Sequence, residues 1–348
     1  MRPGADSAGG RGSGDGPRPD PARGRWSGGR LPRLLVATAL AVTAAVLCER
    51  WLSPERRLEA RIPPEVAERA ACAEQDFRAA RESLRRARAE LGDDALDEVP
   101  QRVRGLVGPE LSPLVTTLGN LDAKVLAASP DWAPALTVAM AGWGIEPGDV
   151  VAASFTGSFP GLNLAVVMAC RALEVDLIAV SSVTASTWGA TEPGFTWPEL
   201  EARLVREGRI RAVSRAITIG GCEDRGTDLS PEGLEAALHI QRAAAAELGA
   251  EALAPRSLVE AVEARMKVFR SAAGGRPITI YVSAGGNHAS LGGSPAVLRF
   301  RSGYIPAEPF DLSARRGLVA RFAEQGVPSL LLLNIQELAA RWGVGAGD

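Results

Sequence analysis

Three residues of this chain have side chains that could together perform nucleophilic chemistry. Ser158 lies in the segment GSFPGLN, at an expected turn between a strand and a helix. Its hydroxyl could attack a carbonyl carbon if His288 removed the proton and Asp224 or Asp228 oriented the imidazole. The flanking glycines do not have the G-x-S-x-G spacing of a nucleophile elbow. The alternative interpretation is that Ser158 caps the helix and binds an anion, while His288 forms loop hydrogen bonds.

Polar, glycine-containing segments also follow several predicted strands. Glycine lets the backbone approach a ligand, and free N–H groups at helix N-termini favour an anion. Since ligands of parallel sheets bind beyond the carboxyl ends of the strands, we expect a polar, anionic ligand there. For Arg225 the alternative is an ion pair. The candidate ligand-binding residues are Thr156, Gly157, Ser158, Asn163, Ser182, Thr184, Ser186, Arg225, Gly285, Gly286 and Asn287.

Other classes of site are disfavoured by motifs and composition. The sequence contains neither G-x-G-x-x-G nor G-x-x-x-x-G-K-[ST], so a dinucleotide or P-loop nucleotide is disfavoured. We expect no cofactor. The four cysteines form no C-x-x-C pair, and His239 and His288 are the only histidines, so no metal centre is expected. The formal net charge of -2 gives no indication of a nucleic-acid partner.

Short apolar runs alternate with helical segments from about residue 100 onward. This order is typical of an α/β fold, and we expect a mostly parallel sheet with flanking helices. Capping signals precede helices expected at 197–207, 231–247 and 258–273: Thr196 with Glu199, Ser230 with Pro231, and Ser257 with Glu260. The predicted strands are Val150–Phe155, Leu177–Ser181, Ala216–Ile219, Ile278–Val282 and Leu330–Leu333.

The region before this domain has a different composition. Residues 1–30 are rich in Gly, Pro, Arg and Ser and predict a disordered tail. Residues 31–52 contain an uncharged apolar core and predict one transmembrane anchor, with a cleaved signal peptide or a core helix as alternatives. Residues 53–99 predict a helical stalk that packs on the domain at 100–348 or self-associates. The arginines of the tail favour a cytoplasmic N-terminus and an extracytoplasmic domain at the cell membrane.

Several segments together resemble the poly-gamma-glutamate system protein family of bacteria. They are GLVGPELSPLVTTLGNLDAK (105–124), GSFPGLN (157–163), SSVTASTWGAT (181–191), FTWPELE (195–201), DRGTDLSPEG (224–233) and GGNHASLG (285–292). The resemblance implies a role in poly-gamma-glutamate capsule or polymer biosynthesis and export, with the polymer synthetase and transport proteins as partners. It implies no particular catalytic residues.

Three functional hypotheses follow. The first is a membrane-anchored accessory component that binds polyglutamate, a small anionic glutamyl ligand or a partner subunit through the strand-end loops. The second is a Ser158-dependent hydrolase or transferase that acts on γ-glutamyl amide bonds. The third is a membrane-tethered sensor of a small anionic ligand.

Overall fold

The computed structural model describes residues 62–92, 96–293, 301–307 and 317–345. The predicted tail at 1–30 and the predicted anchor at 31–52 lie outside these residues, as does the beginning of the predicted stalk. Among the helices that are described, none combines the length and the hydropathy needed to cross a bilayer.

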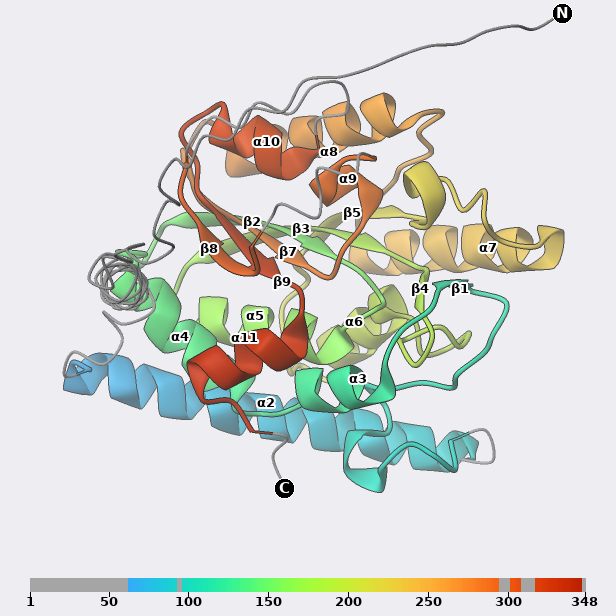
Figure 1. The fold of residues 1–348 in the computed structure, drawn as a ribbon, viewed down its shortest axis with the longest axis horizontal. Helices are drawn as coiled ribbons and strands as arrows, with labels where there is room; N and C mark the ends of the chain where they lie inside the picture. Colours follow the sequence, from blue (N-terminus) through green and yellow to red (C-terminus); the bar gives the residue numbers. More distant parts are fainter. Residues whose placement is uncertain (1–61, 93–95, 294–300, 308–316, 346–348) are drawn as a thin grey trace, which may run out of the picture. The chain divides into compact units, whose positions relative to one another are not determined.

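A seven-stranded sheet lies at the centre of the described part of the chain (Figure 1). Its strand order is β6-β5-β3-β2-β7-β9-β8, and every neighbouring pair is parallel except β8 with β9. The α/β prediction with a mostly parallel sheet is therefore confirmed. The strands are β2 (Val150–Phe155), β3 (Asp176–Ser182), β5 (Ser214–Thr218), β6 (Glu251–Ala252), β7 (Ile278–Ala284), β8 (Gly303–Ile305) and β9 (Ser329–Leu332).

A separate two-stranded parallel sheet lies beyond the carboxyl end of β3. It pairs β1 (Val115–Thr117) with β4 (Ala185–Ser186). This small sheet fixes the segment that follows β3 against the segment that precedes α3 (Leu121–Ala127).

Helices cover both faces of the large sheet (Figure 1). Strand β2 is buried at all of its positions, as expected for a strand between two helical layers. One face packs on α4 (Trp132–Gly142), α5 (Pro160–Ala172), α6 (Trp197–Arg206) and α11 (Ile335–Trp342), with α3 (Leu121–Ala127) beside α5 and α11. The other face packs on α8 (Leu258–Ala273), α9 (His288–Leu291) and α10 (Leu318–Ala323). Helix α7 (Pro231–Leu248) packs against β5 and α6, and the short helices η2 (Gln101–Val103) and η3 (Cys222–Asp224) lie in connections.

The long helix α2 (Pro64–Leu91) forms an outer layer on α4 and α5. Its residues Phe77, Ala80 and Leu84 are fully buried and belong to the same hydrophobic cluster as Val151 and Phe155 of β2. Helix α2 therefore contributes to the core of the α/β domain.

The capping signals begin the helices where the sequence predicts them. Ser230 Oγ accepts a hydrogen bond from Gly233 N–H, and Ser257 Oγ accepts one from Glu260 N–H. Glu199 accepts the backbone N–H of Thr196 at 3.0 Å, the return bond of a capping box.

The direction of chain winding changes between β2 and β7. From β2 the chain proceeds outward through β3, β5 and β6, and it then returns through α8 to β7 on the other side of β2. In open α/β sheets, ligands bind beyond the strand ends at such a switch point. The loops after β2 and β7 are therefore where the fold favours a site.

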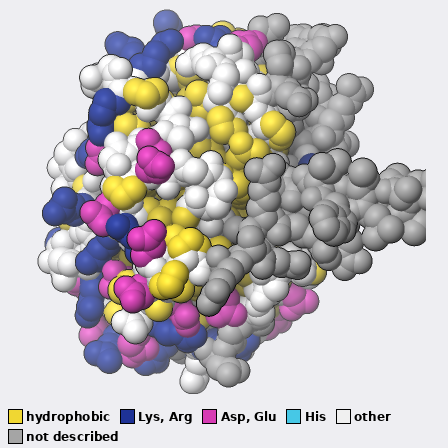
Figure 2. All heavy atoms as spheres, turned by 90° about the vertical axis from the view of Figure 1, so that its left-hand side faces the viewer, with side chains coloured by type: hydrophobic (Ala, Val, Ile, Leu, Met, Phe, Trp, Pro, Cys, Tyr) yellow, Lys and Arg dark blue, Asp and Glu magenta, His cyan; other side chains and the backbone are white. Residues whose placement is uncertain are grey.

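The surface has charges of both signs. On the face in Figure 2, Lys and Arg alternate with Asp and Glu along the margin, and hydrophobic side chains gather nearer its centre.

Candidate active site

Ser158 lies in the turn that joins β2 to α5, and its side chain is half-buried. Thr156 Oγ1 donates to Ala284 O of β7 at 3.1 Å and accepts the N–H of Ser158 at 3.3 Å. Asn163 Nδ2 donates to Thr156 O at 2.8 Å from the first turn of α5. These bonds fix the turn against β7 and α5. They hold Ser158 in place two residues before Pro160, the first residue of α5.

Ser186 contacts the Ser158 hydroxyl twice. Its backbone N–H donates to Ser158 Oγ at 3.1 Å, and its own Oγ lies 3.2 Å from Ser158 Oγ in a second hydrogen bond. Ser186 is held in place because its strand β4 pairs with β1. The predicted ligand-binding residues Ser158 and Ser186 are thus brought together, although they follow different strands.

Lys124 of α3 completes this arrangement. Its Nζ donates to Ser186 Oγ at 2.6 Å and to the backbone oxygen of Ser158, and it lies 4.3 Å from the centre of the Phe159 ring. The side chain is only 3% exposed, and no carboxylate pairs with it among the described residues. Burial lowers the pKa of Lys124 from 10.5 to about 7. We call Lys124, Ser186 and Ser158 the serine–lysine relay.

Glycines permit the close approach of the segments that carry the relay. A β-carbon on Gly157 would lie 3.0 Å from Ala190 O, and one on Gly189 would lie 2.7 Å from Gly157 O. Ala190 N–H donates to Gly157 O at 2.8 Å, which joins the β2 loop directly to the β3 loop. A side chain at Gly157 or Gly189 would force Ser158 and Ser186 apart.

The structure does not join His288 and Asp224 to Ser158. His288 is exposed, and its Nδ1 accepts the backbone N–H of Glu223 at 3.0 Å. No hydrogen bond links His288 to Ser158 or to Asp224 among the described residues. The predicted Ser–His–Asp arrangement is replaced by one in which a lysine adjoins the serine.

Asp224 is instead part of a buried ion pair. Its carboxylate receives Arg265 Nε and Nη2, both at 2.9 Å, and Thr218 Oγ1 at 2.8 Å. The Arg265 side chain is fully buried and that of Asp224 is 2% exposed. The preceding residue Glu223 and Asp224 itself both have positive φ angles, 54° and 64°. The ion pair therefore holds a turn that non-glycine residues rarely adopt.

The remaining candidates divide into two groups. Ser182 Oγ donates to Phe155 O at 3.2 Å and Thr184 Oγ1 to Ile219 O at 2.9 Å, so both buried hydroxyls bind backbone. Arg225 is exposed and lies 3.6 Å from Glu223, not against Asp224. In the β7 loop, Asn287 Oδ1 caps α9 through Ser290 N–H, while its Nδ2 atom is buried without a partner in the described structure.

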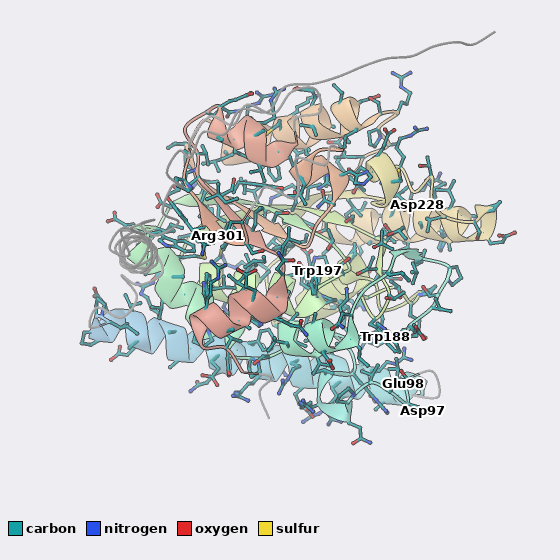
Figure 3. All side chains as sticks on the ribbon, in the orientation of Figure 1. Asp97, Glu98, Trp188, Trp197, Asp228 and Arg301 are labelled. Carbon is teal, nitrogen blue, oxygen red and sulfur yellow. The ribbon has the colours of Figure 1, made fainter. Side chains whose placement is uncertain are left out.

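The glycines of the β7 loop have different surroundings. Gly285 has a φ of 90°, and a β-carbon there would collide with Thr156 Oγ1. Gly286 is exposed. The loop after β7 therefore lies directly against the loop that bears Ser158, at the switch point of the sheet. Trp188 and Asp228, which lie in the loops after β3 and β5, are on the right-hand side of the molecule near β1 and β4 (Figure 3).

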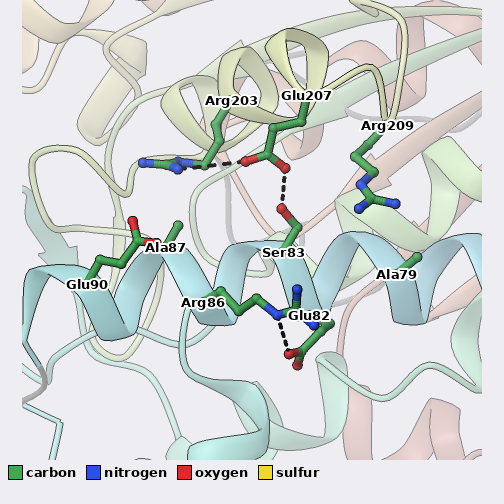
Figure 4. Close-up of a pocket in the computed structure, with 9 residues that line it drawn as sticks. All are labelled: Ala79, Glu82, Ser83, Arg86, Ala87, Glu90, Arg203, Glu207 and Arg209. Atoms are coloured by element: carbon green, nitrogen blue, oxygen red, sulfur yellow. Dashed lines mark hydrogen bonds and ion pairs between the residues drawn. The ribbon is translucent and has the colours of Figure 1, made fainter.

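A cavity of about 400 Å³ lies elsewhere, between α2 and the end of α6 (Figure 4). Its charged groups largely neutralise one another: Arg86 Nε is 2.8 Å from Glu82, and Arg203 Nη1 is 3.7 Å from Glu207. Ser83 Oγ also donates to Glu207. No residue of the serine–lysine relay lines this cavity. Its two ion pairs lie within α2 and at the end of α6, and the Ser83–Glu207 hydrogen bond joins the two helices.

Lys124 is not among the site residues that the sequence pattern predicts. It ends the segment GNLDAK, in which Asn120 Oδ1 caps α3 by accepting Ala123 N–H at 2.9 Å. The available signal is a lysine in the short, otherwise mostly apolar helix LDAKVLA. Lysine is rarely buried without a partner, so its position among apolar residues indicates a candidate functional group.

Comparison of the chain with models of protein families, with curated proteins and with solved structures finds no match.

Proposed function

We propose that the α/β domain is a serine-dependent acyl hydrolase or transferase in which Ser158 is the nucleophile and Lys124 is the base. The observation that carries this proposal is the buried amine of Lys124, 2.6 Å from Ser186 Oγ, with Ser186 hydrogen-bonded to Ser158 Oγ at 3.2 Å. A nucleophile, a group that can accept its proton and an intermediate hydroxyl are the parts that such chemistry requires.

The protonation of Lys124 supports a role as base. An ammonium group buried without a carboxylate is unfavourable, and this burial lowers the pKa of Lys124 to about 7. At neutral pH a large fraction of the chains therefore has a neutral amine. In the structure Lys124 donates to Ser186 and Ser186 donates to Ser158, as a protonated lysine requires. In the neutral form both hydroxyl hydrogens can turn toward Lys124, so that its lone pair accepts the Ser186 proton and Ser186 Oγ accepts the proton of Ser158.

The reaction follows from these contacts. Ser158 Oγ forms a bond to the carbonyl carbon of the substrate, its proton passes to Ser186 Oγ, and the Ser186 proton passes to Lys124 Nζ. Collapse of the tetrahedral intermediate breaks the carbon–nitrogen bond, and the leaving amine takes a proton back from Lys124 through Ser186. Water or an acceptor amine then attacks the Ser158 ester, loses its proton along the same path, and releases Ser158 as the acyl product departs.

The oxyanion would form at the positive end of α5. The first N–H groups of a helix lack intrahelical acceptors and stabilise negative charge. Ser158 lies one residue before the N-cap, Phe159, of this 13-residue helix. The N–H of Ser186, 3.1 Å from Ser158 Oγ, also stabilises negative charge on the attacking oxygen.

We propose γ-glutamyl amides as the substrate class. The segments of the chain that resemble the poly-gamma-glutamate system proteins supply the relay: Lys124 ends 105–124, Ser158 lies in 157–163 and Ser186 lies in 181–191. On the same basis we propose that the protein works at the cell membrane beside the synthetase and transport proteins of this polymer.

The test is cleavage by the purified full-length protein. It should shorten γ-linked polyglutamate, or transfer its acyl groups to an added amine, and a fluorophosphonate probe should label Ser158. Ser158→Ala should abolish both results, and Ser186→Ala should reduce the rate by about 10²-fold or more. Ser271→Ala, which changes an exposed serine of α8, is the matched control. Unchanged polymer together with an unlabelled Ser158 would contradict the proposal.

A second proposal is that the loops bind an anionic glutamyl ligand without cleaving it, as an accessory component or a sensor would. The buried Asn287 Nδ2, a donor without an acceptor in the described structure, favours it. Calorimetry with the Ser158→Ala protein separates the alternatives. Saturable binding of glutamyl oligomers without any turnover by the unmodified protein would support binding alone.

A further inference from the structure

The amine of Lys124 is enclosed on two sides by residues that give it no hydrogen bond. The half-buried ring of Phe159 lies 4.3 Å from Nζ. On another side lies Gly119, where an added β-carbon would be 3.1 Å from Lys124 Cε and 3.2 Å from Ser186 Oγ. Phe159 also lies near the β7 loop, because a β-carbon added at Gly285 would be 3.6 Å from Phe159 Cδ2.

We propose that Phe159 is a positioning residue that, with the backbone at Gly119, closes the Lys124 amine from water and keeps it available as a base. This inference rests on the proposed function, because it assigns to Phe159 the control of the group that activates Ser158.

Two effects of the ring oppose each other. The face of an aromatic ring attracts a cation, which favours the ammonium form. The bulk of the ring excludes water, which favours the neutral amine. Burial lowers the pKa of Lys124, and we assign to the Phe159 ring a part of that exclusion of water.

The charged groups on the neighbouring elements do not account for the state of Lys124. Helix α3 itself carries Asp122, and α11, which packs on α3, carries Glu337 and Arg341. The facing part of α5 and the β4 strand carry no charged residue before Arg171. None of these groups contributes to the lowered pKa of Lys124.

The composition of the chain makes the inference directly measurable. Lys124 and Lys267 are its only lysines, and Lys267 is exposed on α8. A full-length protein labelled with ¹³C at lysine Cε therefore gives two lysine signals, one of which is an internal reference. The titration of each signal is followed from pH 5 to pH 11, which reports the amine itself and requires no substrate.

The two variants of Phe159 have different expected effects on the Lys124 midpoint. Phe159→Ala admits water, so the Lys124 midpoint should move upward, toward the ordinary lysine value of 10.5, by about one pH unit or more. Phe159→Leu keeps most of the apolar bulk but loses the aromatic face, so the midpoint should stay or move slightly downward. Leu118→Ala, a change in the same turn as Gly119 at a side chain that is 90% exposed, should move neither signal.

Each outcome has a distinct meaning. An unchanged Lys124 midpoint in folded Phe159→Ala protein overturns the inference, and so does an upward shift in Phe159→Leu equal to that in Phe159→Ala. If Phe159→Ala does not fold, the Lys124 midpoint is measured in Phe159→Leu and Phe159→Met, two apolar side chains of different shape. Equal upward shifts of the midpoint in both variants overturn the inference. If the midpoints behave as expected but Ser158 neither reacts nor is labelled, the proposed function fails and the control of Lys124 by Phe159 stands.

Discussion

Gly161 of α5 lies against the backbone of Ala127, the last residue of α3: a β-carbon on Gly161 would be 2.6 Å from the next α-carbon, that of Ala128. This contact sets the distance between the helix that carries Lys124 and the turn that carries Ser158. The relay therefore depends on a residue that takes no part in the chemistry.

Gly161→Ala should accordingly lower activity more than it lowers stability. The added methyl group must push α3 away from α5, and overpacking of this kind costs about 1–3 kcal/mol. The movement lengthens the Lys124–Ser186 contact of 2.6 Å, so kcat should fall about 10-fold or more while KM changes little. Val167→Ala, a buried change on the same helix, is the stability control. Equal losses of kcat in the two variants at equal unfolding free energy would contradict the prediction.

Asp224→Asn should destabilise the fold strongly. It leaves the fully buried Arg265 with an uncompensated charge, and loss of one partner of such a pair costs about 3–5 kcal/mol. Urea denaturation of the variant and of the double variant Asp224→Asn/Arg265→Met measures this. The double variant should lose less stability than the sum of the single changes, because no charge is left unpaired. An Asp224→Asn protein as stable as the unmodified one would show that the pair is not closed to water.

The sequence predicted the fold better than it predicted the site, and the reason is physical. Strands such as Val150–Phe155 are continuous apolar runs because both faces are covered, and residues such as Ser230 and Ser257 mark helix starts through local bonds. These signals lie within a few residues of one another in the chain, so they can be recognised without knowledge of the fold.

The site depends on contacts between distant segments. Lys124 and Ser186 are 62 residues apart, and long-range contacts such as the pairing of β1 with β4 and the contact of Gly161 with α3 bring them together. Ser158 could be selected because a serine in a strand-to-helix turn is a local feature. Its partner could not, because the fold places a lysine beside it and turns His288 toward Glu223.

Glu201 of α6 should make stability depend on pH. Its buried carboxylate accepts Val213 N–H at 2.9 Å, Ser214 N–H at 2.8 Å and Ser214 Oγ at 2.6 Å. Burial nevertheless raises the pKa of Glu201 above 4.5, despite these hydrogen bonds. The folded chain thus holds this proton more tightly than the unfolded chain. The free energy of unfolding should therefore be highest below pH 4.5 and fall as the pH rises through the raised pKa of the folded state.

Glu201→Gln removes this dependence. Urea denaturation at several pH values between 4 and 8 should show that the difference in unfolding free energy moves in favour of the Gln variant as the pH rises. The amide of Gln must donate a hydrogen bond to Ser214, whose hydroxyl is hydrogen-bonded to Ser181, which in turn accepts from Trp197. One of the two serine hydroxyls then has no acceptor, which costs about 1–3 kcal/mol at every pH. Parallel pH profiles for the two proteins would mean that Glu201 is ionised in both the folded and unfolded states.

The pH dependence of the reaction should report Lys124. Only the neutral amine accepts a proton, so kcat/KM should rise with pH, with a midpoint near the Lys124 pKa of about 7, and reach a plateau above it. Lys124→Met should remove this step and lower kcat/KM by about 10²–10⁴-fold. Lys124→Arg separates a base from a fixed positive charge, because a guanidinium stays protonated at these pH values and should be as inactive as Met. An active Arg variant would mean that Lys124 supplies charge alone.

The same group should affect stability with a defined sign. Because the pKa of Lys124 is lowered from 10.5 to about 7, the folded chain binds the proton less tightly than the unfolded chain. The penalty for burying the ammonium is therefore complete below about pH 7 and is relieved as the pH rises toward 10.5. Compared with Lys124→Met, the unmodified protein should gain stability between pH 7 and pH 9, as measured by urea denaturation at constant ionic strength. A constant difference between the two proteins across this range would show that Lys124 keeps its proton in the fold, and the activation of Ser158 would then need another base.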